Sequence, residues 1–401
     1  MSRVVRSNRA QAAVICSALS SIGAFTLTVA VARQSDGKTF GEYALAGSIL
    51  ILVTGLIRAG ITEVILAKSD PRNYIADALK LIAVLALAIA SITLITGWLL
   101  RSPFIMLLAL IIPGLTLLDF SRTILVSIGN AGLAVTQDAA WMTATIIGSA
   151  ATMIGEVNVY FVFAWWGITG SIVGCMTIAR MGRTLPRHQP SHTRAILFNP
   201  LYTLDYLAGS GSAQLAINFL AAATAASVVG AIRGAATLLS PVNLVASAAR
   251  PLLIAAISRG RRTGTTQVRT SVQFAVLLVV ATAPIVIVAA LVPDQIGRNL
   301  LGATWATAEE VVLPLGLEAL LGLVTGVAFA GHRAFEAGSN ILAVRICLAI
   351  MRISAVVCAG SIWGVVGAAW AMPIVSGFGS IVWWGSYLRL VRRSRPPIDI
   401  P

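Results

Sequence analysis

The chain has 401 residues, of which 57% are hydrophobic and only 11% are charged, and its mean hydropathy is +0.88. Soluble domains carry about 25% charged residues, so this composition excludes a soluble globular protein and predicts a polytopic membrane protein. The formal net charge of +14 would suggest a nucleic-acid partner in a soluble chain. In a membrane protein it must first be compared with the distribution of lysine and arginine over the loops.

A transmembrane helix needs about 20 predominantly apolar residues. By that criterion the sequence predicts about twelve transmembrane helices, at residues 10–32, 44–67, 77–100, 103–128, 133–154, 158–179, 198–222, 229–257, 271–293, 308–330, 339–361 and 364–388. We expect the eighth helix to bend, because Pro241 and Pro251 each remove a backbone donor inside it.

An even number of spans places both termini on the same side, and basic residues identify that side. The segments on the side opposite the termini hold only Arg33, Lys38, Arg101 and Arg298, whereas the other segments are rich in arginine. We therefore expect both termini to be cytoplasmic. This distribution accounts for most of the basic excess, so no nucleic-acid partner is expected.

The polar segment RMGRTLPRHQPSHTR (180–194) separates six predicted spans from six. Similar landmarks occur on both sides of it, such as WGITG at 166–170 and WGVVG at 363–367. An even number of spans per half gives a parallel repeat, with a pseudo-twofold axis along the membrane normal and a cavity between the halves. The predicted organisation is a six-helix lobe (1–180), a cytoplasmic linker (181–197), a second six-helix lobe (198–388) and a basic cytoplasmic tail (389–401).

Six arginines fall inside predicted spans, where a charge costs at least about 2.5–3.5 kcal/mol. They are Arg58, Arg122, Arg233, Arg250, Arg345 and Arg352. Asp119 and Arg122 are three residues apart on one helical face, which predicts a local structural pair. Arg58 and Glu63 are five residues apart, so they point in different directions and neutralise each other poorly.

Intramembrane arginines without a local acid usually face a hydrated cavity or pair across the helix bundle. Because arginine is always charged and can donate two hydrogen bonds to a phosphate, a cavity lined by such residues favours a phosphate or diphosphate ligand. The predicted substrate-binding residues are Arg58, Arg233, Arg250, Arg345 and Arg352. For Arg58 the alternative is a structural ion pair with another helix.

Three acids could couple transport to a proton or sodium ion: Asp138, Asp205 and Glu318. For each the alternative is a helix cap or a structural partner for an arginine. The four cysteines lie in apolar stretches without metal-ligand spacing, so we interpret them as packing residues. We expect no metal, no other cofactor and no catalytic residues.

Several segments in order resemble the bacterial polysaccharide (O-antigen, Wzx-type) flippases of the multidrug/oligosaccharidyl-lipid/polysaccharide (MOP) exporter superfamily. FGEYALAGSILILVTGLIRAGITEVILA (40–67) resembles their second span and VVGAIRGAATLLSPVNLVASAARPLLIAAISR (228–259) their eighth. LLGATWATAEEVVLPLGLEALL (300–321) is similar to the segment leading into their tenth span, and GVVGAAWAM (364–372) to the start of their twelfth.

This resemblance implies two six-helix lobes that export a polyprenyl-diphosphate-linked oligosaccharide across the bacterial cytoplasmic membrane by alternating access. The family's cavity arginines on spans 2 and 8 would correspond to Arg58 and to Arg233 or Arg250. The implied partners are the lipid-linked glycan, membrane lipid and possible polysaccharide polymerases or glycosyltransferases. The first span departs from some relatives, since it holds no arginine between Arg9 and Arg33.

Two other functions stay open. A multidrug exporter of the same superfamily would favour acidic and aromatic cavity residues, whereas this chain holds more arginine than acid inside its spans. A polytopic glycosyltransferase, ligase or polymerase would need a catalytic acid on a sizeable external loop. The longest predicted external connection, about 294–307, offers Asp294 without a paired carboxylate.

Overall fold

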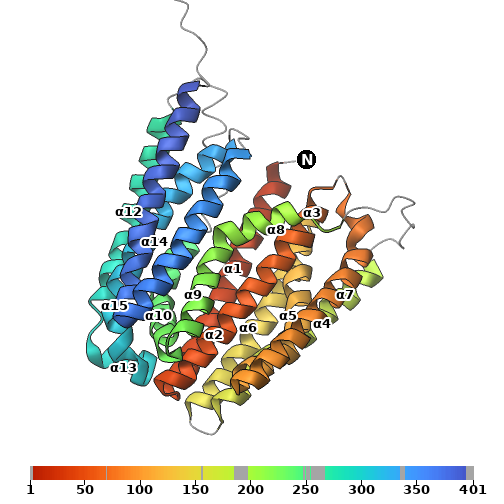
Figure 1. Cartoon of the computed structure of the whole chain (residues 1–401). Helices are drawn as coiled ribbons and strands as arrows, with labels where there is room; N and C mark the ends of the chain where they lie inside the picture. The colour runs from red at the N-terminus through yellow and green to blue at the C-terminus, as the bar shows by residue number, and fades with distance from the viewer. Residues whose placement is uncertain are drawn as a thin grey trace, which may run out of the picture. The chain divides into compact units, whose positions relative to one another are not determined.

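A computed structural model describes residues 3–68, 70–154, 157–184, 197–246, 249, 253, 267–334 and 339–393. The described residues form helices joined by short connections, without a strand (Figure 1). The predicted all-α membrane fold is therefore confirmed. Eight helices of this part of the chain, or nine if one bent pair forms a single span, are long and apolar enough to cross a membrane. The number twelve stays a prediction.

The helices follow in chain order. The first are α1 (Arg3–Arg33), α2 (Gly37–Ile57), α3 (Glu63–Leu66), α4 (Ile75–Leu100), α5 (Pro103–Ile128), α6 (Ala131–Met153) and α7 (Val159–Thr184). They are followed by α8 (Pro200–Tyr206), α9 (Ser212–Ala223), α10 (Ala226–Leu238), α12 (Gln267–Ala290), α13 (Asp294–Leu301), α14 (Trp305–Ala334) and α15 (Ser339–Arg393). Four short segments are η1 (Arg58–Thr62), η2 (Pro71–Tyr74), η3 (Leu207–Gly211) and η4 (Gly302–Thr304).

The chain divides into two units. The first comprises Met1–Gly230 and Gly297–Trp305, and the second comprises Ala231–Ile296 and Ala306–Pro401. Helix α9 packs in the first unit, where the Ser48 hydroxyl on α2 donates to the side-chain oxygen of Gln214 at 2.9 Å. The lobe division expected at residues 181–197 stays a prediction, because most of that segment lies outside the described residues.

Helix α2 begins seven residues earlier than hydropathy predicted, because polar residues form its first turn. The Asp36 carboxylate caps the helix by accepting from the Thr39 backbone N–H at 2.8 Å. Further along, a Cβ atom at Gly41 would overlap the backbone of Ala226. The glycine therefore allows α2 and the start of α10 to cross in direct backbone contact.

Two facing helices of the first unit contain π-helical turns. In η1, which continues α2, the Glu63 backbone N–H donates to the Arg58 carbonyl, five residues back. In η3, between α8 and α9, Gly209 has the non-helical angles φ −90° and ψ −107°. The two helices meet directly, because the Asn199 backbone N–H donates to the Gly60 carbonyl at 3.0 Å. Predicted span 2 is therefore a continuous helix with a π-helical turn, whereas predicted span 7 is interrupted at Gly209.

Tyr206 closes this contact between α2 and α8. Its hydroxyl donates to the Ile51 carbonyl at 3.0 Å, and its ring lies where a Cβ of Gly55 would stand. Hydropathy does not reveal such a contact, because a glycine in a membrane helix can face either lipid or another helix.

Helices α5 and α7 pack closely against each other in the first unit. A Cβ at Gly114 would overlap the side chain of Ser171, and one at Gly174 would lie 2.9 Å from the Leu118 backbone. Small residues thus bring the two helices close together, as is usual for membrane helices. A buried aromatic cluster completes this core, with Tyr43 contacting the rings of Phe104 and Phe163 at 5.8 and 5.9 Å between centroids.

The second unit contains α12, α14 and α15. Helix α15 is interrupted at Gly364, where φ +65° and ψ −149° divide it into two arms that are each longer than the about 20 residues of a span. A hydrogen bond at 3.0 Å joins the hydroxyls of Ser271 on α12 and Tyr387 on α15. His332 on α14 is buried and lies 3.0 Å from the Ser386 hydroxyl.

The predicted bend after residue 229 is confirmed in part. Segments Ala226–Leu238 and Ser240–Ala246 meet at 59°, and Pro241 stands at the start of the second segment. A proline fits the first turn of a helix, where its missing N–H has no partner to lose. Pro251 lies outside the described residues.

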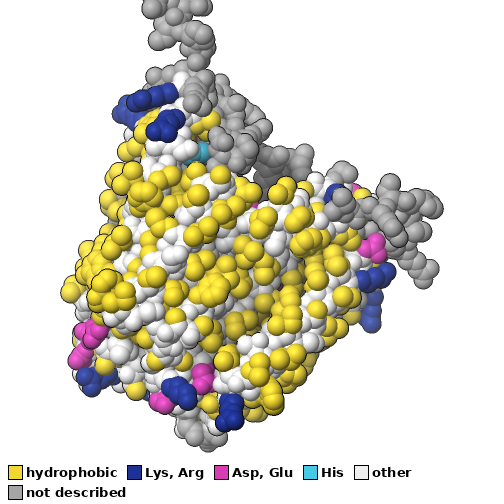
Figure 2. Space-filling view, in the orientation of Figure 1, with side chains coloured by type: hydrophobic (Ala, Val, Ile, Leu, Met, Phe, Trp, Pro, Cys, Tyr) yellow, Lys and Arg dark blue, Asp and Glu magenta, His cyan; other side chains and the backbone are white. Residues whose placement is uncertain are grey.

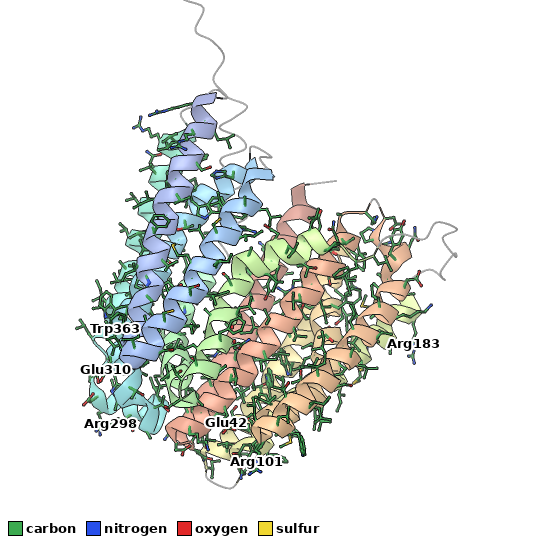
Figure 3. The ribbon with its side chains drawn as sticks, viewed as in Figure 1. Glu42, Arg101, Arg183, Arg298, Glu310 and Trp363 are labelled. Atoms are coloured by element: carbon green, nitrogen blue, oxygen red, sulfur yellow. The ribbon has the colours of Figure 1, made fainter. Side chains whose placement is uncertain are left out.

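Hydrophobic side chains cover most of the face shown in Figure 2, and charged side chains gather toward the ends of the helices. In the first unit, Arg101 and Glu42 lie at one end and Arg183 at the other (Figure 3). The packing interpretation of the cysteines is wrong for Cys175, Cys347 and Cys358, which are exposed, while Cys16 is buried. Apolar residues face both the core and the lipid in a membrane protein, so hydropathy could not separate the two.

Candidate functional site

A cluster of four charged side chains lies inside the first unit and joins three helices. Arg58 stands where α2 passes into η1, Asp119 and Arg122 are on α5, and Asp138 is on α6. The Arg58 guanidinium binds Asp119 with two hydrogen bonds, from Nε to Oδ2 at 3.0 Å and from Nη2 to Oδ1. Such paired bonds match the planar fork of arginine to a carboxylate.

Arg122 binds the same carboxylate from the other side. Its Nη2 donates to Asp119 Oδ1 at 2.7 Å, and its Nη1 donates to the hydroxyl of Ser20 on α1 at 2.8 Å. Nη1 also lies 3.8 Å from Asp138 Oδ2. Asp119 therefore has two arginine partners, one from its own helix and one from α2. The predicted local pair of Asp119 and Arg122 is present, but it is part of a larger cluster.

Exposure falls steadily across the cluster. The side chain of Arg58 is 41% exposed, that of Arg122 23%, that of Asp119 12% and that of Asp138 0%. Neither carboxylate oxygen of Asp138 has a hydrogen-bond partner. Arg58 is thus the member that a ligand can reach most readily, and Asp138 is the member with unused acceptor capacity.

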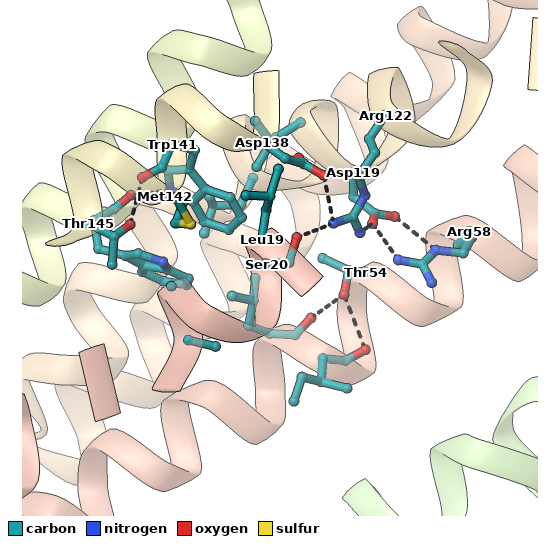
Figure 4. A pocket seen from close by; sticks show the side chains of 17 residues that line it. Leu19, Ser20, Thr54, Arg58, Asp119, Arg122, Asp138, Trp141, Met142 and Thr145 are labelled. Atoms are coloured by element: carbon teal, nitrogen blue, oxygen red, sulfur yellow. Dashed lines mark hydrogen bonds and ion pairs between the residues drawn. The ribbon is translucent and has the colours of Figure 1, made fainter. Parts of the chain in front are cut away.

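Two cavities of the first unit meet at this cluster. The inner cavity has a volume of about 210 Å³ and contains Arg58, Asp119, Arg122 and Asp138 at one end and aromatic residues at the other (Figure 4). Its aromatic end is formed by Trp141 and Trp166, whose rings stack with centroids 5.4 Å apart. The cavity therefore offers a charged end for a polar group and an apolar end for a ring or chain.

The outer cavity, of about 460 Å³, shares Ser20, Ala24, Arg58 and Arg122 with the inner one. Its α1 wall consists of small residues on one face of the helix: Ala13, Cys16, Ser17, Ser20, Ser21 and Ala24. These positions follow the three- and four-residue spacing of a helical stripe. Arg58 lines both cavities, so a ligand in either one can reach its guanidinium.

The other predicted substrate-binding residues lie elsewhere. In the second unit, Arg352 binds Glu318 at 3.1 Å and the Ser376 hydroxyl at 2.8 Å, so it connects α14 with both arms of α15. The Arg345 guanidinium lies 4.1 Å from the centroid of the Phe329 ring, as in a cation–π contact. Arg233 is on α10, and its buried Nε has no hydrogen-bond partner.

The last two predicted site residues are Asp205 and Arg250. Asp205 is a half-buried residue of α8, and Arg250 lies outside the described residues. None of the described residues forms a group of three or more His, Cys, Asp or Glu that could hold a metal ion. The structure thus brings Arg58, Asp119, Arg122 and Asp138 together, while Arg345, Arg352 and Glu318 belong to the second unit.

Sequence reasoning missed Ser20, Trp141 and Tyr206. The serine and cysteine stripe on α1 was a usable signal for Ser20, because polar residues at helical spacing in an apolar span indicate a polar lining. The two tryptophans carry no such signal, since tryptophan is also common where membrane helices meet water.

No protein-family model matches the sequence. No curated protein matches it either. Solved structures do match. An inward-facing multidrug resistance MATE family transporter of the MOP superfamily is similar with a TM-score of 0.71 and 14% identity, over 94% of this chain and 96% of that chain. The lipid II flippase MurJ, in an inward closed conformation, gives a TM-score of 0.69 and 12% identity, over 95% of this chain and 90% of that chain.

The fold of the chain is similar to the folds of these MOP-superfamily proteins. A third MOP-superfamily structure, from Pyrococcus furiosus, matches with a TM-score of 0.56 and 13% identity over 99% of this chain and the whole of that chain. Its description reports a binding pocket of reversed polarity that suggests a different function. Proteins with this fold thus include a multidrug transporter and a lipid flippase, so the fold alone does not assign a function to this chain.

Proposed function

We propose that this protein is a flippase that moves a polyprenyl-diphosphate-linked oligosaccharide from the cytoplasmic to the outer leaflet of the bacterial cytoplasmic membrane by alternating access. The observation that carries the proposal is the position of Arg58. Its side chain is the most exposed of the four in the charge cluster, and Arg58 lines both cavities of the first unit. A diphosphate suits this group, because its oxygens accept two parallel hydrogen bonds from arginine.

The residues around Arg58 support a ligand in which an anionic group is joined to less polar groups. The outer cavity is lined by small and hydroxyl-bearing residues of α1, while the inner cavity ends at two tryptophans. The MOP fold is also that of the lipid II flippase MurJ. A cavity with both polar and aromatic walls suits a substrate that carries a diphosphate, sugars and a lipid chain.

A transport assay in proteoliposomes tests this function. A fluorescent polyprenyl-diphosphate-linked oligosaccharide is placed in the membrane, and its movement between leaflets is followed by accessibility to an impermeant quencher. We expect rapid flipping with the wild-type protein and loss of flipping with Arg58→Ala. Arg183→Ala, which removes an exposed arginine at the end of the same unit, is the matched control and should flip normally. Equal flipping in protein-free liposomes would contradict the proposal.

A multidrug exporter is the second candidate, and one observation favours it. The inner cavity places Asp119 and Asp138 near the stacked rings of Trp141 and Trp166, and acids with aromatic rings attract organic cations. Ethidium efflux from the same proteoliposomes distinguishes the candidates. A drug exporter would lose efflux with Asp138→Asn and keep it with Arg58→Ala, whereas a glycan flippase would show no ethidium efflux.

A further inference from the structure

Asp119 accepts hydrogen bonds from the same guanidinium N–H groups of Arg58 that an anionic ligand would use. Both of its oxygens accept from the Arg58 fork, one from Nε at 3.0 Å and one from Nη2. A phosphate or diphosphate would accept from the same two donors in the same plane. Asp119 is therefore an internal anion at the position where the proposed substrate's anion would bind.

Asp119 would keep a partner if Arg58 left it. Arg122 binds Asp119 Oδ1 at 2.7 Å, and Arg122 is itself held by the Ser20 hydroxyl at 2.8 Å and faces Asp138 at 3.8 Å. Loss of the last partner of a buried carboxylate strongly destabilises the folded protein. Since Arg122 remains, the release of Arg58 does not leave Asp119 unpaired.

Arg58 is also the more accessible partner of the pair. Its side chain is 41% exposed, against 12% for Asp119. It stands at the first position of the π-helical segment η1, which faces the interrupted helix around η3. A π-turn holds one residue more than an α-helical turn, and such turns are frequent at functional sites. Arg58 thus combines an accessible side chain with a place in such a turn, whereas Asp119 lies within the regular helix α5.

We propose that Asp119 is a positioning residue that acts as an exchangeable counter-ion for Arg58. It holds the guanidinium in the empty protein and gives it up to the diphosphate group of the substrate, while Arg122 keeps Asp119 neutralised. This inference rests on the proposed function. The diphosphate belongs to a lipid carrier or is free in solution, and the ligands of the experiment distinguish these sources.

The exchange predicts opposite effects on binding and on transport. A ligand must displace Asp119, so the carboxylate weakens binding. The same carboxylate binds Arg58 again after transport and so promotes release of the ligand on the other side of the membrane. Removal of the Asp119 charge should therefore tighten binding and slow turnover. A residue with a purely structural role would instead lower both the amount of folded protein and its activity.

Asp138→Asn is the matched control for Asp119→Asn. Both variants remove one carboxylate from the same cavity, but the ion pair of Asp138 is with Arg122 and that of Asp119 is with both arginines. A general effect of charge would therefore act in both variants. If ligand and carboxylate compete for the Arg58 guanidinium, only Asp119→Asn should bind the ligand more tightly.

The experiment measures binding of inorganic pyrophosphate and of farnesyl diphosphate to the purified full-length protein by calorimetric titration. We expect Asp119→Asn to bind pyrophosphate about tenfold more tightly than wild type, which corresponds to about 1.4 kcal/mol. Asp138→Asn should change affinity by less than about threefold, and Arg58→Ala should bind neither ligand. A lipid-borne source predicts that farnesyl diphosphate binds more tightly than pyrophosphate, whereas a free diphosphate predicts equal affinities.

A double variant covers the case in which Asp119→Asn does not fold. Asp119→Asn with Arg122→Gln removes one positive and one negative group together, so Arg122 is not left without the carboxylate of Asp119. It keeps the net charge of the cluster and leaves Arg58 without its competitor. We expect it to bind pyrophosphate at least about threefold more tightly than wild type. In the flipping assay, Asp119→Asn should lower both the apparent KM and the maximal rate.

Each other result overturns a specific claim. Equal tightening in Asp119→Asn and Asp138→Asn would show a general effect of charge and overturn the exchange. No tightening in either Asp119 variant, with binding still lost in Arg58→Ala, would also overturn the exchange but leave the proposed function standing. Binding in Arg58→Ala equal to wild type, or no binding in any of the proteins, would overturn the arginine site and the proposed function with it.

Discussion

Gly55→Ala should disrupt the contact between α2 and α8. A Cβ at this position would overlap the Tyr206 ring and hydroxyl, so the ring must move and its hydrogen bond to the Ile51 carbonyl, now 3.0 Å long, must lengthen or break. Overpacking costs about 1–3 kcal/mol, and a lost hydrogen bond costs about 0.5–1.5 kcal/mol. Alanine regains about 0.5–1 kcal/mol over glycine in a helix. The expected net destabilisation is about 1–3 kcal/mol.

A double-mutant cycle isolates this effect. Thermal unfolding is measured in detergent for wild type, Gly55→Ala, Tyr206→Ala and the double variant. Once the tyrosine ring is absent, Gly55→Ala should be neutral or stabilising, which gives a coupling of about 1–3 kcal/mol between the two positions. Gly132→Ala is the control, because no atom lies within 4 Å of a Cβ built there. The reasoning is refuted if Gly55→Ala is as harmless as Gly132→Ala.

The remaining predictions concern the ends of the first unit. Asp36→Ala should cost about 0.5–2 kcal/mol of stability through loss of the helix cap, and Asp36→Asn much less. Hydrogen bonds from Thr39 hold the pKa of Asp36 below its usual value of 3.8, so its contribution is complete above that pH and is lost as the pH falls through the folded-state pKa. Unfolding of wild type and Asp36→Asn from pH 2 to 7 checks this, and an advantage of wild type that does not decrease at all as the pH falls below 3.8 would contradict it. In a background without native cysteines, an impermeant reagent outside cells should label Arg101→Cys and not Arg183→Cys; the reverse pattern would contradict the predicted topology.

The helices were predictable because their hydropathy is high and their connections are short. The bounds of α5, Pro103–Ile128, agree with the predicted span 103–128, since Pro103 starts the helix and Gly129 ends it with a φ of +93°. The π-helical turns η1 and η3 were not predictable from hydropathy. They arise where two helices approach each other, and hydropathy averaged over a span carries no information about its partner.

The charge cluster was predictable only in part. The pair of Asp119 and Arg122 follows from helical spacing alone. The bond between Arg58 and Asp119 joins residues 61 positions apart, so it depends on how α2 and α5 pack. The sequence left Arg58 with two interpretations, a ligand contact and an ion pair across helices. The structure contains the ion pair, and the exposure of Arg58 leaves room for the ligand contact as well.

The choice of Asp138 as a functional acid depended on its place in an apolar helix. The structure adds that its side chain is fully buried and that neither oxygen has a hydrogen-bond partner. Coupling of transport to a proton or sodium ion through Asp138, Asp205 or Glu318 stays a prediction. Glu318 lies in the second unit and binds Arg352 at 3.1 Å, the structural alternative that the sequence had left open.

Export and protein abundance measured together for Arg58→Ala and Arg58→Lys test the central claim most directly. Both variants should accumulate to near wild-type levels in the membrane, because Arg122 still neutralises Asp119. Arg58→Ala should abolish glycan export, and Arg58→Lys should restore it only in part, because lysine lacks the planar fork. A purely structural ion pair would instead cost about 3–5 kcal/mol when broken and make Arg58→Ala scarce. An abundant and fully active Arg58→Ala protein would contradict the account.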